Sequence, residues 1–410
     1  MKLDENVDVK IRRSNGKSDW QTAQLGDVIE LFDSMRVPLN SSERQARQGE
    51  YPYYGAQGII DHIDGYIFDG RYILVAEDGE NLNSKKLPLA LFATGKFWVN
   101  NHAHILRGKQ DVADDTFLLA CLNNANIKPF VTGAAQPKLS QANMRQIEIP
   151  LPPLPVQRRV AGILSAYDEL LENCQRRIRL LEAMARALYR EWFVHFRFPG
   201  HEKHPHVKSP LGEIPQGWDV KHVPDCVDIN PRVVVPRDGE KPFVPMGCLS
   251  NDSMLITDVE SRAGNSGAKF QNGDTLFARI TPCLENGKTG FVQFLPDAQA
   301  VAFGSTEFIV LRSRTLTPEF IYLLARSDEF RGVAIKSMSG ATGRQRVQEQ
   351  CFNDFQVVQP PHVLLDRFSA IVAPSFQMIY KLHLQIQNLR RTRDLLLPRL
   401  LSGQVNLKEN

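Results

Sequence analysis

A run of apolar residues at heptad spacing between Pro155 and Phe196 constrains this chain more than any other feature. From Val160 to Trp192, apolar residues recur in alternating steps of four and three residues. This spacing is typical of a long helix that buries one narrow stripe against a partner helix. At about 1.5 Å per residue, a helix of about 40 residues would be about 60 Å long, which is more than a compact domain needs.

The same pattern occurs again 208 residues later in the chain. At this offset AAQPKLSQANMRQIEIPLPP, which ends at Pro153, lies over TGRQRVQEQCFNDFQVVQPP, which ends at Pro361. The heptad positions continue without a gap to Leu400, and only Ser375 and Arg393 are not apolar. Upstream, with small shifts of the offset, HAHILR (102–107) lies over EFIVLR (307–312). We infer that the chain contains one unit twice, a mixed domain followed by a long helix.

Two helices with such seams in one chain most simply pack against each other. We expect an α+β protein in which two duplicated mixed α/β domains are separated by a pair of long antiparallel coiled-coil helices, with pseudo-two-fold symmetry. The alternative is that each helix packs on its own domain. The expected divisions are 1–153, 154–200, 201–361 and 362–410, the second and fourth being the helices. The predicted seam residues are Val160, Leu164, Tyr167, Leu171, Ile178, Leu181, Leu188, Phe368, Val372, Ile379, Leu382, Ile386, Leu389 and Leu396.

Composition and charge exclude several classes of protein. The formal net charge is only +3, so any surface that attracts nucleic acid must be local. The six cysteines include no CxxC pair, which argues against a metal or disulfide scaffold and favours a cytoplasmic location. The N-terminal segment lacks an apolar core, and no apolar run is long enough for a membrane span, so we expect no membrane association.

The sequence contains no convincing catalytic constellation. The GKT at Gly287–Thr289 lacks the earlier glycine of a phosphate-binding loop, and no strand–GxGxxG–helix unit occurs. The histidines of NNHAH (100–104) and HEKHPH (201–206) fit packing or surface positions better than a metal site. We therefore predict no catalytic residues, no metal and no cofactor in this chain.

Binding signals are stronger, and they recur in both copies. The loop SMSGATGRQRV (337–347) and its partner VTGAAQPKL (131–139) combine small residues with the side chains that read base edges or neutralise phosphate. Polar loops at 76–81 and 278–288 align as well, and YPYYGAQG (51–58) adds a glycine-bounded aromatic turn, in which at least one tyrosine fits a core position better. The candidate DNA-binding residues are Tyr53, Tyr54, Gln57, Gln136, Lys138, Arg279, Thr281, Asn286, Lys288, Arg344, Gln345 and Arg346.

Several segments together resemble the specificity subunit of type I restriction-modification enzymes. They are PYYGAQGI, the helix entry IPLPPLPVQRRVAGILSAYDELL, the helix exit EWFVHFRFPG, LGEIPQGW, GATGRQRV and RDLLLPRLLSG. The resemblance covers residues 19–403 and includes the duplication. It implies that each globular unit is a target recognition domain reading one half of a bipartite, asymmetric site in double-stranded DNA, and that the helices fix the gap between the halves.

The resemblance also implies the partners. Two methyltransferase (modification) subunits that use S-adenosylmethionine to methylate adenine N6 would dock on the chain, and ATP-dependent restriction subunits would join optionally. The base-reading loops of this family vary, so its reading residues cannot be transferred to positions here. Three alternatives remain: a catalytic nuclease or methyltransferase, a scaffold with two protein-binding heads that does not bind DNA, and a specificity subunit of another restriction-modification class.

Overall fold

The structure, a computed structural model, describes residues 12–13, 20–133, 135–341, 343–405 and 407. Residues 1–11 and 14–19 of the predicted first domain lie outside the described residues. The chain divides into two compact units, Met1–Leu170 with Leu389–Asn410, and Leu171–Asn388. Each unit contains one mixed domain and part of both long helices, because the boundary passes through both helices.

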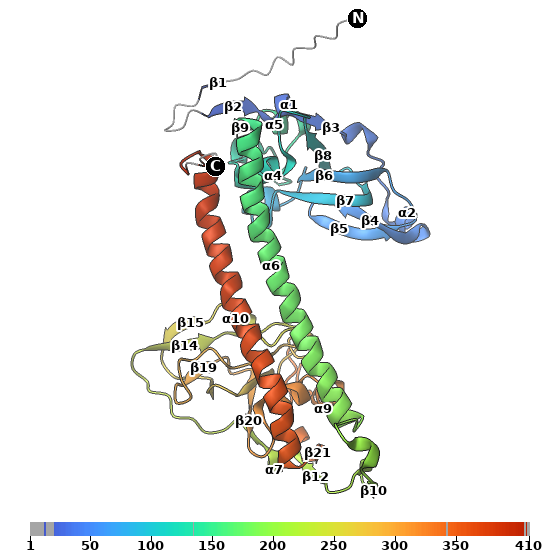
Figure 1. Cartoon of the computed structure of the whole chain (residues 1–410), viewed down its shortest axis with the longest axis vertical. Coiled ribbons are helices and arrows are strands. Elements are labelled where there is room, and N and C mark those ends of the chain that lie inside the picture. The colour runs from blue at the N-terminus through green and yellow to red at the C-terminus, as the bar shows by residue number, and fades with distance from the viewer. Residues whose placement is uncertain (1–11, 14–19, 134, 342, 406, 408–410) are drawn as a thin grey trace, which may run out of the picture. The chain divides into compact units, whose positions relative to one another are not determined.

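The two heptad patterns form the two long helices, α6 (Leu154–Tyr189) and α10 (His362–Leu401), drawn in green and red in Figure 1. After Tyr189 the helix continues as a π-helical turn, η3 (Arg190–Val194), so the regular helix ends before the predicted Phe196. Every predicted seam residue is buried or half-buried. The narrow stripe read from the sequence is therefore the buried side of both helices.

Contacts inside each unit give the pairing of the helices. In the first unit, Val160 and Leu164 near the start of α6 share one apolar cluster with Leu400 and Leu401 at the end of α10. In the second unit, the ring centroids of Trp192, beyond the end of α6, and Phe368, near the start of α10, lie 5.9 Å apart. The start of one helix thus packs with the end of the other, which makes the pair antiparallel. The helices also pack on the domains, so the two arrangements weighed from the sequence occur together.

The polar seam position Arg393 is accommodated by an ion pair. Its Nη1 lies 2.9 Å from Oδ1 of Asp168 on α6, within the first unit. Both side chains are partly solvated, and such pairs typically contribute about 0–1 kcal/mol. The other polar position, Ser375, is half-buried beside a small groove that is also lined by Leu181 and Met378. The buried seam therefore continues through both polar positions, Ser375 and Arg393.

The first domain is built on a six-stranded sheet in the order β3-β8-β6-β7-β4-β5, with a smaller sheet β1-β2-β9. Within the larger sheet, β4 and β7 pair in parallel and the other neighbours are antiparallel. The strands are β1 (Arg12–Arg13), β2 (Gln21–Gln24), β3 (Ile29–Leu31), β4 (Gln48–Gly55), β5 (Gly58–Ile63), β6 (Phe68–Ala76), β7 (Ala90–Val99), β8 (Ala103–Gly108) and β9 (Glu148–Leu151). The short helices are α1 (Leu25–Val28), η1 (Asp33–Met35), α2 (Ser41–Ala46), α3 (Asn81–Ser84), α4 (Asp115–Asn124), η2 (Lys128–Phe130) and α5 (Gln141–Arg145).

The second domain divides its strands between two four-stranded sheets, β13-β20-β17-β18 and β15-β14-β19-β16, and two strand pairs, β12-β21 and β10-β11. Its strands are β10 (His206–Ser209), β11 (Gly212–Pro215), β12 (Asp219–His222), β13 (Val227–Ile229), β14 (Glu240–Val244), β15 (Glu260–Ala263), β16 (Ala268–Phe270), β17 (Thr275–Ala278), β18 (Thr289–Phe291), β19 (Ala302–Gly304), β20 (Phe308–Ser313) and β21 (Gln356–Gln359). Its short helices are η4 (His201–Lys203), α7 (Val223–Cys226), η5 (Met246–Cys248), α8 (Pro318–Ala325), α9 (Asp328–Lys336) and η6 (Glu349–Phe352).

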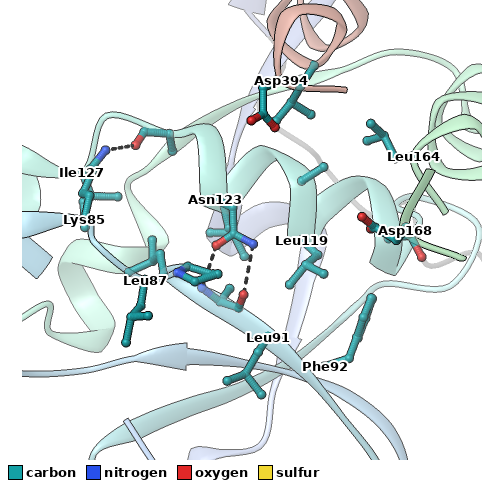
Figure 2. Close-up of a pocket in the computed structure, with 18 of the residues that line it drawn as sticks. Lys85, Leu87, Leu91, Phe92, Leu119, Asn123, Ile127, Leu164, Asp168 and Asp394 are labelled. Carbon is teal, nitrogen blue, oxygen red and sulfur yellow. Dashed lines mark hydrogen bonds between the residues drawn. The ribbon is translucent and has the colours of Figure 1, made fainter. Parts of the chain in front are cut away.

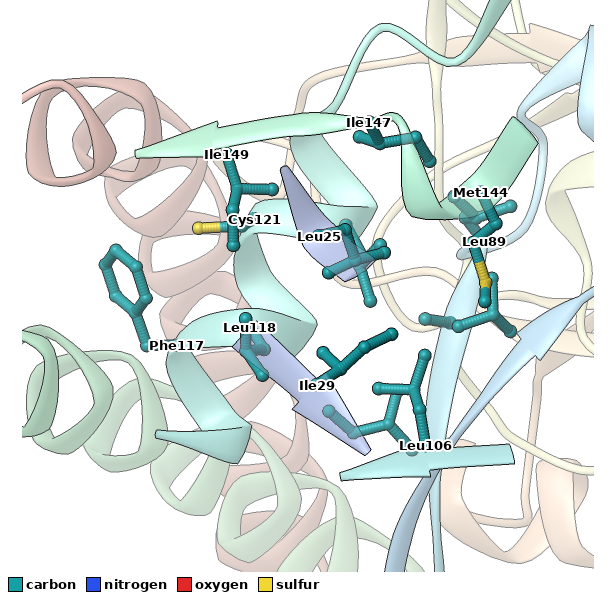
Figure 3. Packing of buried hydrophobic residues seen from close by; sticks show 14 of the residues in the cluster. Leu25, Ile29, Leu89, Leu106, Phe117, Leu118, Cys121, Met144, Ile147 and Ile149 are labelled. Carbon is teal, nitrogen blue, oxygen red and sulfur yellow. The ribbon is translucent and has the colours of Figure 1, made fainter. Parts of the chain in front are cut away.

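Helix α4 organises the core of the first domain. The carboxylate of Asp114 accepts hydrogen bonds from the amides of Thr116 and Phe117, which fixes the start of the helix. Its buried face carries Phe117, Leu118 and Cys121 and lies among Leu25, Ile29, Leu106, Met144 and Ile149 (Figure 3). The two long helices add Val160, Leu164, Leu400 and Leu401 to the same cluster. The core of the first domain therefore includes residues from the last turn of α10.

The duplication is visible in matched hydrogen bonds. The amide of Leu25 donates to the carbonyl of Ile147 in the first domain, and Val223 donates to Phe355 in the second, at 2.8 and 2.9 Å. The pairing of β2 with β9 recurs in β12 with β21, and the order β3-β8-β6-β7 recurs in β13-β20-β17-β18. Two copies of one fold thus occupy the chain, as the sequence repeat predicts.

Candidate nucleic-acid interface

Two loops in equivalent positions carry the candidate reading residues. The first loop, 132–138, is closed by reciprocal backbone hydrogen bonds of 2.7 and 2.9 Å between Thr132 and Lys138. The second loop, 339–346, is closed in the same way between Ser339 and Arg346, at 2.9 and 3.0 Å. Ala134 in the first loop and Thr342 in the second lie outside the described residues. Each loop thus places a cationic residue at the point where it closes.

Both loops turn at a glycine directly after the closing residue. Gly133 has φ of 84° and Gly340 has φ of 125°. Residues with a Cβ rarely adopt these angles, so glycine is required for each loop to close on its cation. The two glycines therefore serve the same geometric purpose in the two domains.

The loops are tied to the strands by a second set of matched bonds. The amide of Leu139 donates to the carbonyl of Glu77 at 2.7 Å, and the amide of Val347 donates to the carbonyl of Arg279 at 2.8 Å. Glu77 directly follows β6, and Arg279 directly follows β17. The loops are therefore set at corresponding strand ends, and Glu77 and Arg279 occupy equivalent positions with opposite charge.

In the first domain, the cation of the loop is held by a carboxylate. Lys138 Nζ lies 3.2 Å from Oε1 of Glu77, whose Oε2 receives a 2.8 Å hydrogen bond from Nη1 of Arg36. Burial raises the pKa of Glu77. The hydrogen bond from Arg36 and the neighbouring cations lower this pKa by a larger amount, so the net shift is downward and the carboxylate stays charged. The Lys138 side chain remains 55% exposed, and Gln136 beside it is exposed. Both can therefore reach a ligand.

In the second domain, Arg346 forms a two-pronged ion pair with Glu307. Its Nε and Nη2 lie 2.7 to 3.0 Å from the two carboxylate oxygens, and its side chain is 50% exposed. The hydrogen bond from Arg346 is the main cause that lowers the pKa of Glu307. Arg344 is exposed and forms no side-chain hydrogen bond or ion pair with any residue that the structure describes. The second loop thus offers one positioned guanidinium and one that is unpaired within the described chain.

A basic hollow of about 640 Å³ adjoins Arg279 in the second domain, lined also by Arg232 and Lys269. Nη1 of Arg279 lies 2.7 Å from Oε1 of Glu349. Its Nε is buried and has no hydrogen-bond partner among the described residues. Cations of this kind favour an anionic ligand such as a phosphate group.

The structure corrects two of the predicted contact residues. Tyr53 is fully buried, and its hydroxyl bonds with the backbone of Leu39, so it belongs to the core of the hairpin. Thr281 is also buried, and its hydroxyl accepts a hydrogen bond from the amide of Gln345, so it supports the second loop from below. Both side chains are therefore buried and not available for contact at the surface.

The other predicted residues lie at the surface or partly below it. Tyr54 is half-buried, and Gln57 is exposed at the hairpin turn. Asn286 is exposed, whereas the half-buried Lys288 donates to the carbonyl of Met246. Gln345 is half-buried between the two arginines of the second loop. The prediction that these residues contact DNA stays a prediction.

Sequence reasoning missed the residues that hold the loops and their cations in place. Glu307, Glu349 and the buried pair His104 and Asp33 were not among the predicted site residues, and Glu77 was noticed only as part of a polar loop. The alignment of HAHILR with EFIVLR placed His104 and Glu307 near the ends of equivalent strands. Their partners are distant in sequence, however, so no local pattern indicated the pairs.

A second hollow lies within the first unit and has a different character. It measures about 850 Å³, and Figure 2 shows Leu91, Phe92, Leu119 and Leu164 around it, with Asp168 and Asp394 nearby. The amide group of Asn123 is fully used by the backbone of Ala90, from which it accepts at 2.8 Å and to which it donates at 3.0 Å. This lining offers no nucleophile with an adjacent base. Among the described residues, no cluster of three or more His, Cys, Asp or Glu could hold a metal ion.

Comparisons with known proteins show what the chain is similar to. Residues 17–183 match the family model of the type I restriction modification DNA specificity domain. A Haemophilus influenzae protein assigned as a type I restriction enzyme specificity subunit is 39% identical over 37% of this chain and 38% of its own length. The MjaIX and MjaVIII specificity subunits of Methanocaldococcus jannaschii are 25% and 27% identical, over 69% and 78% of this chain and 66% and 78% of their own lengths.

A solved structure shares the fold. The S subunit of a type I restriction-modification system from M. genitalium superposes with a TM-score of 0.61 at 14% identity, covering 96% of this chain and 98% of its own. The first two relatives are matched over only 38% and 66% of their lengths. No helix in the described parts of the chain is long and apolar enough to cross a membrane. From the family model and the relatives, we conclude that residues 17–183 form a type I restriction modification DNA specificity domain and that the chain as a whole is similar to type I specificity subunits.

Proposed function

We propose that the chain reads a bipartite, asymmetric sequence in double-stranded DNA, with one domain for each half-site. The observation that carries this proposal is the recurrence of one loop architecture around an exposed cation, Lys138 in the first domain and Arg346 in the second. A lysine can neutralise a phosphate, and an arginine can pair with a guanine edge. Because the loops differ in sequence, the two half-sites are expected to differ.

The chain itself is proposed to be non-catalytic. In the proposed complex, two methyltransferase subunits dock on it and transfer a methyl group from S-adenosylmethionine to adenine N6, and restriction subunits that use ATP join optionally. The long helices fix the gap between the half-sites and provide surface for docking. With a formal charge of only +3, much of the phosphate contact would come from partner subunits.

Methylation mapping tests the whole proposal. Co-expression with the methyltransferase subunit of the same system, in a host without adenine methylation of its own, is expected to produce methyladenine within one two-part motif with a fixed gap. Expression of either subunit alone is the control and is expected to leave the DNA unmodified. Methylation by this chain alone would favour the catalytic alternative. Assembly with the methyltransferase without any motif would favour a scaffold.

The reading role of the second loop is tested by Arg344→Ala combined with Arg346→Ala. We expect the assembled complex to lose about tenfold or more in affinity for its mapped duplex, since each lost base-edge contact of this kind typically costs about 1–3 kcal/mol. Fluorescence anisotropy at fixed salt measures the change, and size-exclusion chromatography checks the assembly.

Arg314→Ala is the matched control for this variant. Arg314 is also about half exposed and paired with a carboxylate, Asp228, but it follows the opposite end of β20 from Glu307. It is expected to leave DNA affinity unchanged. Equal affinity for DNA in the double variant and the unsubstituted complex would remove the second loop from the interface.

A further inference from the structure

In both domains a second basic side chain holds the backbone carbonyl of the residue that follows the loop cation. This side chain lies on β8 in the first domain and directly after β17 in the second. In the first domain, Nε2 of His104 on β8 lies 2.9 Å from the carbonyl oxygen of Leu139. In the second domain, Nη2 of Arg279 donates to the carbonyl of Val347 at 3.2 Å. Leu139 follows Lys138, and Val347 follows Arg346. The equivalent carbonyl oxygens of the two domains are therefore held by different side chains, His104 in the first domain and Arg279 in the second.

The contacts of His104 require a doubly protonated ring. Its Nδ1 lies 2.6 Å from Oδ2 of Asp33, and its Nε2 faces the Leu139 carbonyl. A carboxylate and a carbonyl can only accept hydrogen bonds, so both ring nitrogens must donate. The other oxygen of Asp33 accepts from the amide of Ile105 at 2.8 Å, which fixes the carboxylate. His104 is 1% exposed, so water does not replace either partner.

The charges packed around His104 favour this imidazolium. Burial lowers the pKa of His104, but the bonds to Asp33 and to the Leu139 carbonyl, with the charges of Asp33 and Glu77, raise it above its ordinary value of 6.5. Two further cations share these carboxylates, since Arg36 pairs with both Asp33 and Glu77 and Lys138 pairs with Glu77. Each carboxylate in this network therefore lies beside at least two basic side chains, His104 and Arg36 for Asp33, and Arg36 and Lys138 for Glu77.

The second domain has no titratable counterpart to His104. In the alignment of HAHILR with EFIVLR, the residue at this position is the buried Ile309. The anchor is instead Arg279, which remains charged at all ordinary pH values. Proton binding can therefore change the anchoring in one domain only.

We propose that His104 is a positioning residue that holds the first loop in its DNA-reading geometry only while its ring is an imidazolium, whereas Arg279 holds the second loop at any pH. This inference rests on the proposed reading function of the loops. It follows that recognition of the half-site read by the first domain weakens as the pH rises, while recognition of the other half-site does not change.

The direction follows from the geometry of the neutral ring. A neutral ring keeps one proton, and the Asp33 carboxylate attracts it to Nδ1. The lone pair of Nε2 then faces the Leu139 carbonyl oxygen, and the loop loses its anchor. Because the pKa of His104 is raised in the folded chain, the stabilisation is complete below 6.5 and is lost as the pH rises through the raised pKa.

Hydrogen exchange of the full chain tests the anchor without any DNA. After correction for intrinsic rates, protection of the Thr132 and Lys138 amides is expected to fall by about tenfold or more on raising the pH, as a charge-assisted bond is lost. Protection of the Ser339 and Arg346 amides is expected to stay within about twofold over the same range. Parallel behaviour of both loops would overturn the inference.

The Asp33→Asn variant tests whether the anchor depends on protonation of the His104 ring. The carbonyl oxygen of the introduced asparagine can still accept from Ile105, and its amide group can donate to Nδ1, so the neutral ring keeps its proton on Nε2 and continues to hold Leu139. We expect this variant to protect the first loop at every pH. His102→Gln is the control, because His102 is an exposed histidine that pairs with Asp78 close by, and it is expected to leave the pH dependence in place. A pH dependence that survives Asp33→Asn or disappears in His102→Gln would overturn the role of His104.

DNA binding by the assembled complex tests the consequence. The probes are the mapped duplex and two duplexes with one base pair changed in one half-site each, and Lys138→Ala assigns the half-site of the first domain. Discrimination at that half-site is expected to decline with rising pH, and Asp33→Asn is expected to restore it. If the loop responds to pH in hydrogen exchange and the discrimination does not, the proposed reading role of the first loop fails while the anchor stands. If the loop does not respond, the anchor itself fails.

Discussion

Deleting seven residues from each long helix is expected to shorten the gap of the modified motif by about three base pairs and to leave both half-sites unchanged. Suitable segments are 172–178 of α6 and 382–388 of α10, which pair in the antiparallel register given by Trp192 with Phe368. Seven residues of helix correspond to about 10 Å, and one base pair of duplex to about 3.4 Å. Each deletion removes one heptad, so the remaining seam residues stay on the buried side.

Methyladenine mapping in cells that carry the shortened chain and the methyltransferase subunit measures the gap. Modification of the original motif is expected to disappear, since its half-sites would no longer match the spacing of the two domains. Deleting the segment from α6 alone is the control. It leaves the partner helix one heptad too long, and no modification is expected at either spacing. A motif with altered half-sites and the original gap would show that the helices do not set the spacing.

Leu400→Ala combined with Leu401→Ala is expected to destabilise the N-terminal domain, although these residues lie almost at the other end of the chain. Leu400 is 2% exposed and Leu401 5% exposed, within the cluster that contains Phe117 and Val160. A buried leucine replaced by alanine typically costs about 2–5 kcal/mol, and whole domains are stable by only about 5–15 kcal/mol. The double variant is therefore expected to unfold the first domain in a large fraction of molecules at about 37 °C.

Domain-resolved hydrogen exchange measures this effect. Protection is expected to fall in strands β6 and β8 of the first domain and to persist in strands β17 and β20 of the second. Leu395→Ala is the matched control on the same helix, because Leu395 is 62% exposed and is expected to change stability little. Loss of protection confined to the end of α10, with the first sheet intact, would contradict the assigned core.

Much of the fold was predictable because its strongest signals are local. The seam of α6 is encoded in residues three and four positions apart, so its buried face could be assigned from Val160 to Leu188 without any tertiary information. The repeat added the partner helix, since a constant offset maps the first seam onto Phe368 and the residues that follow. The loops of both domains were located in the same way, at the residues before the paired prolines.

The composition of the candidate site was only half predictable. Lys138, Arg344 and Arg346 stand out in their loops as residue types that bind DNA. Tyr53 is also a candidate by residue type, in a turn where at least one tyrosine fits a core position better, and strand pairing does turn its ring into the core and its hydroxyl toward the backbone of Leu39. Which side of a strand faces solvent depends on register, and a shift of one residue reverses it.

The sequence alone therefore determined the duplication, the long paired helices and the positions of two cationic loops, because each depends on spacing along the chain. Only the tertiary structure decided what holds those loops. His104 pairs with Asp33, which lies 71 positions earlier in the chain, and Arg346 pairs with Glu307, which lies 39 positions earlier. Leu400 packs in the same core as Leu25. Ion pairs and core contacts form wherever the topology brings strands together, and no short pattern of residues records which strands will meet.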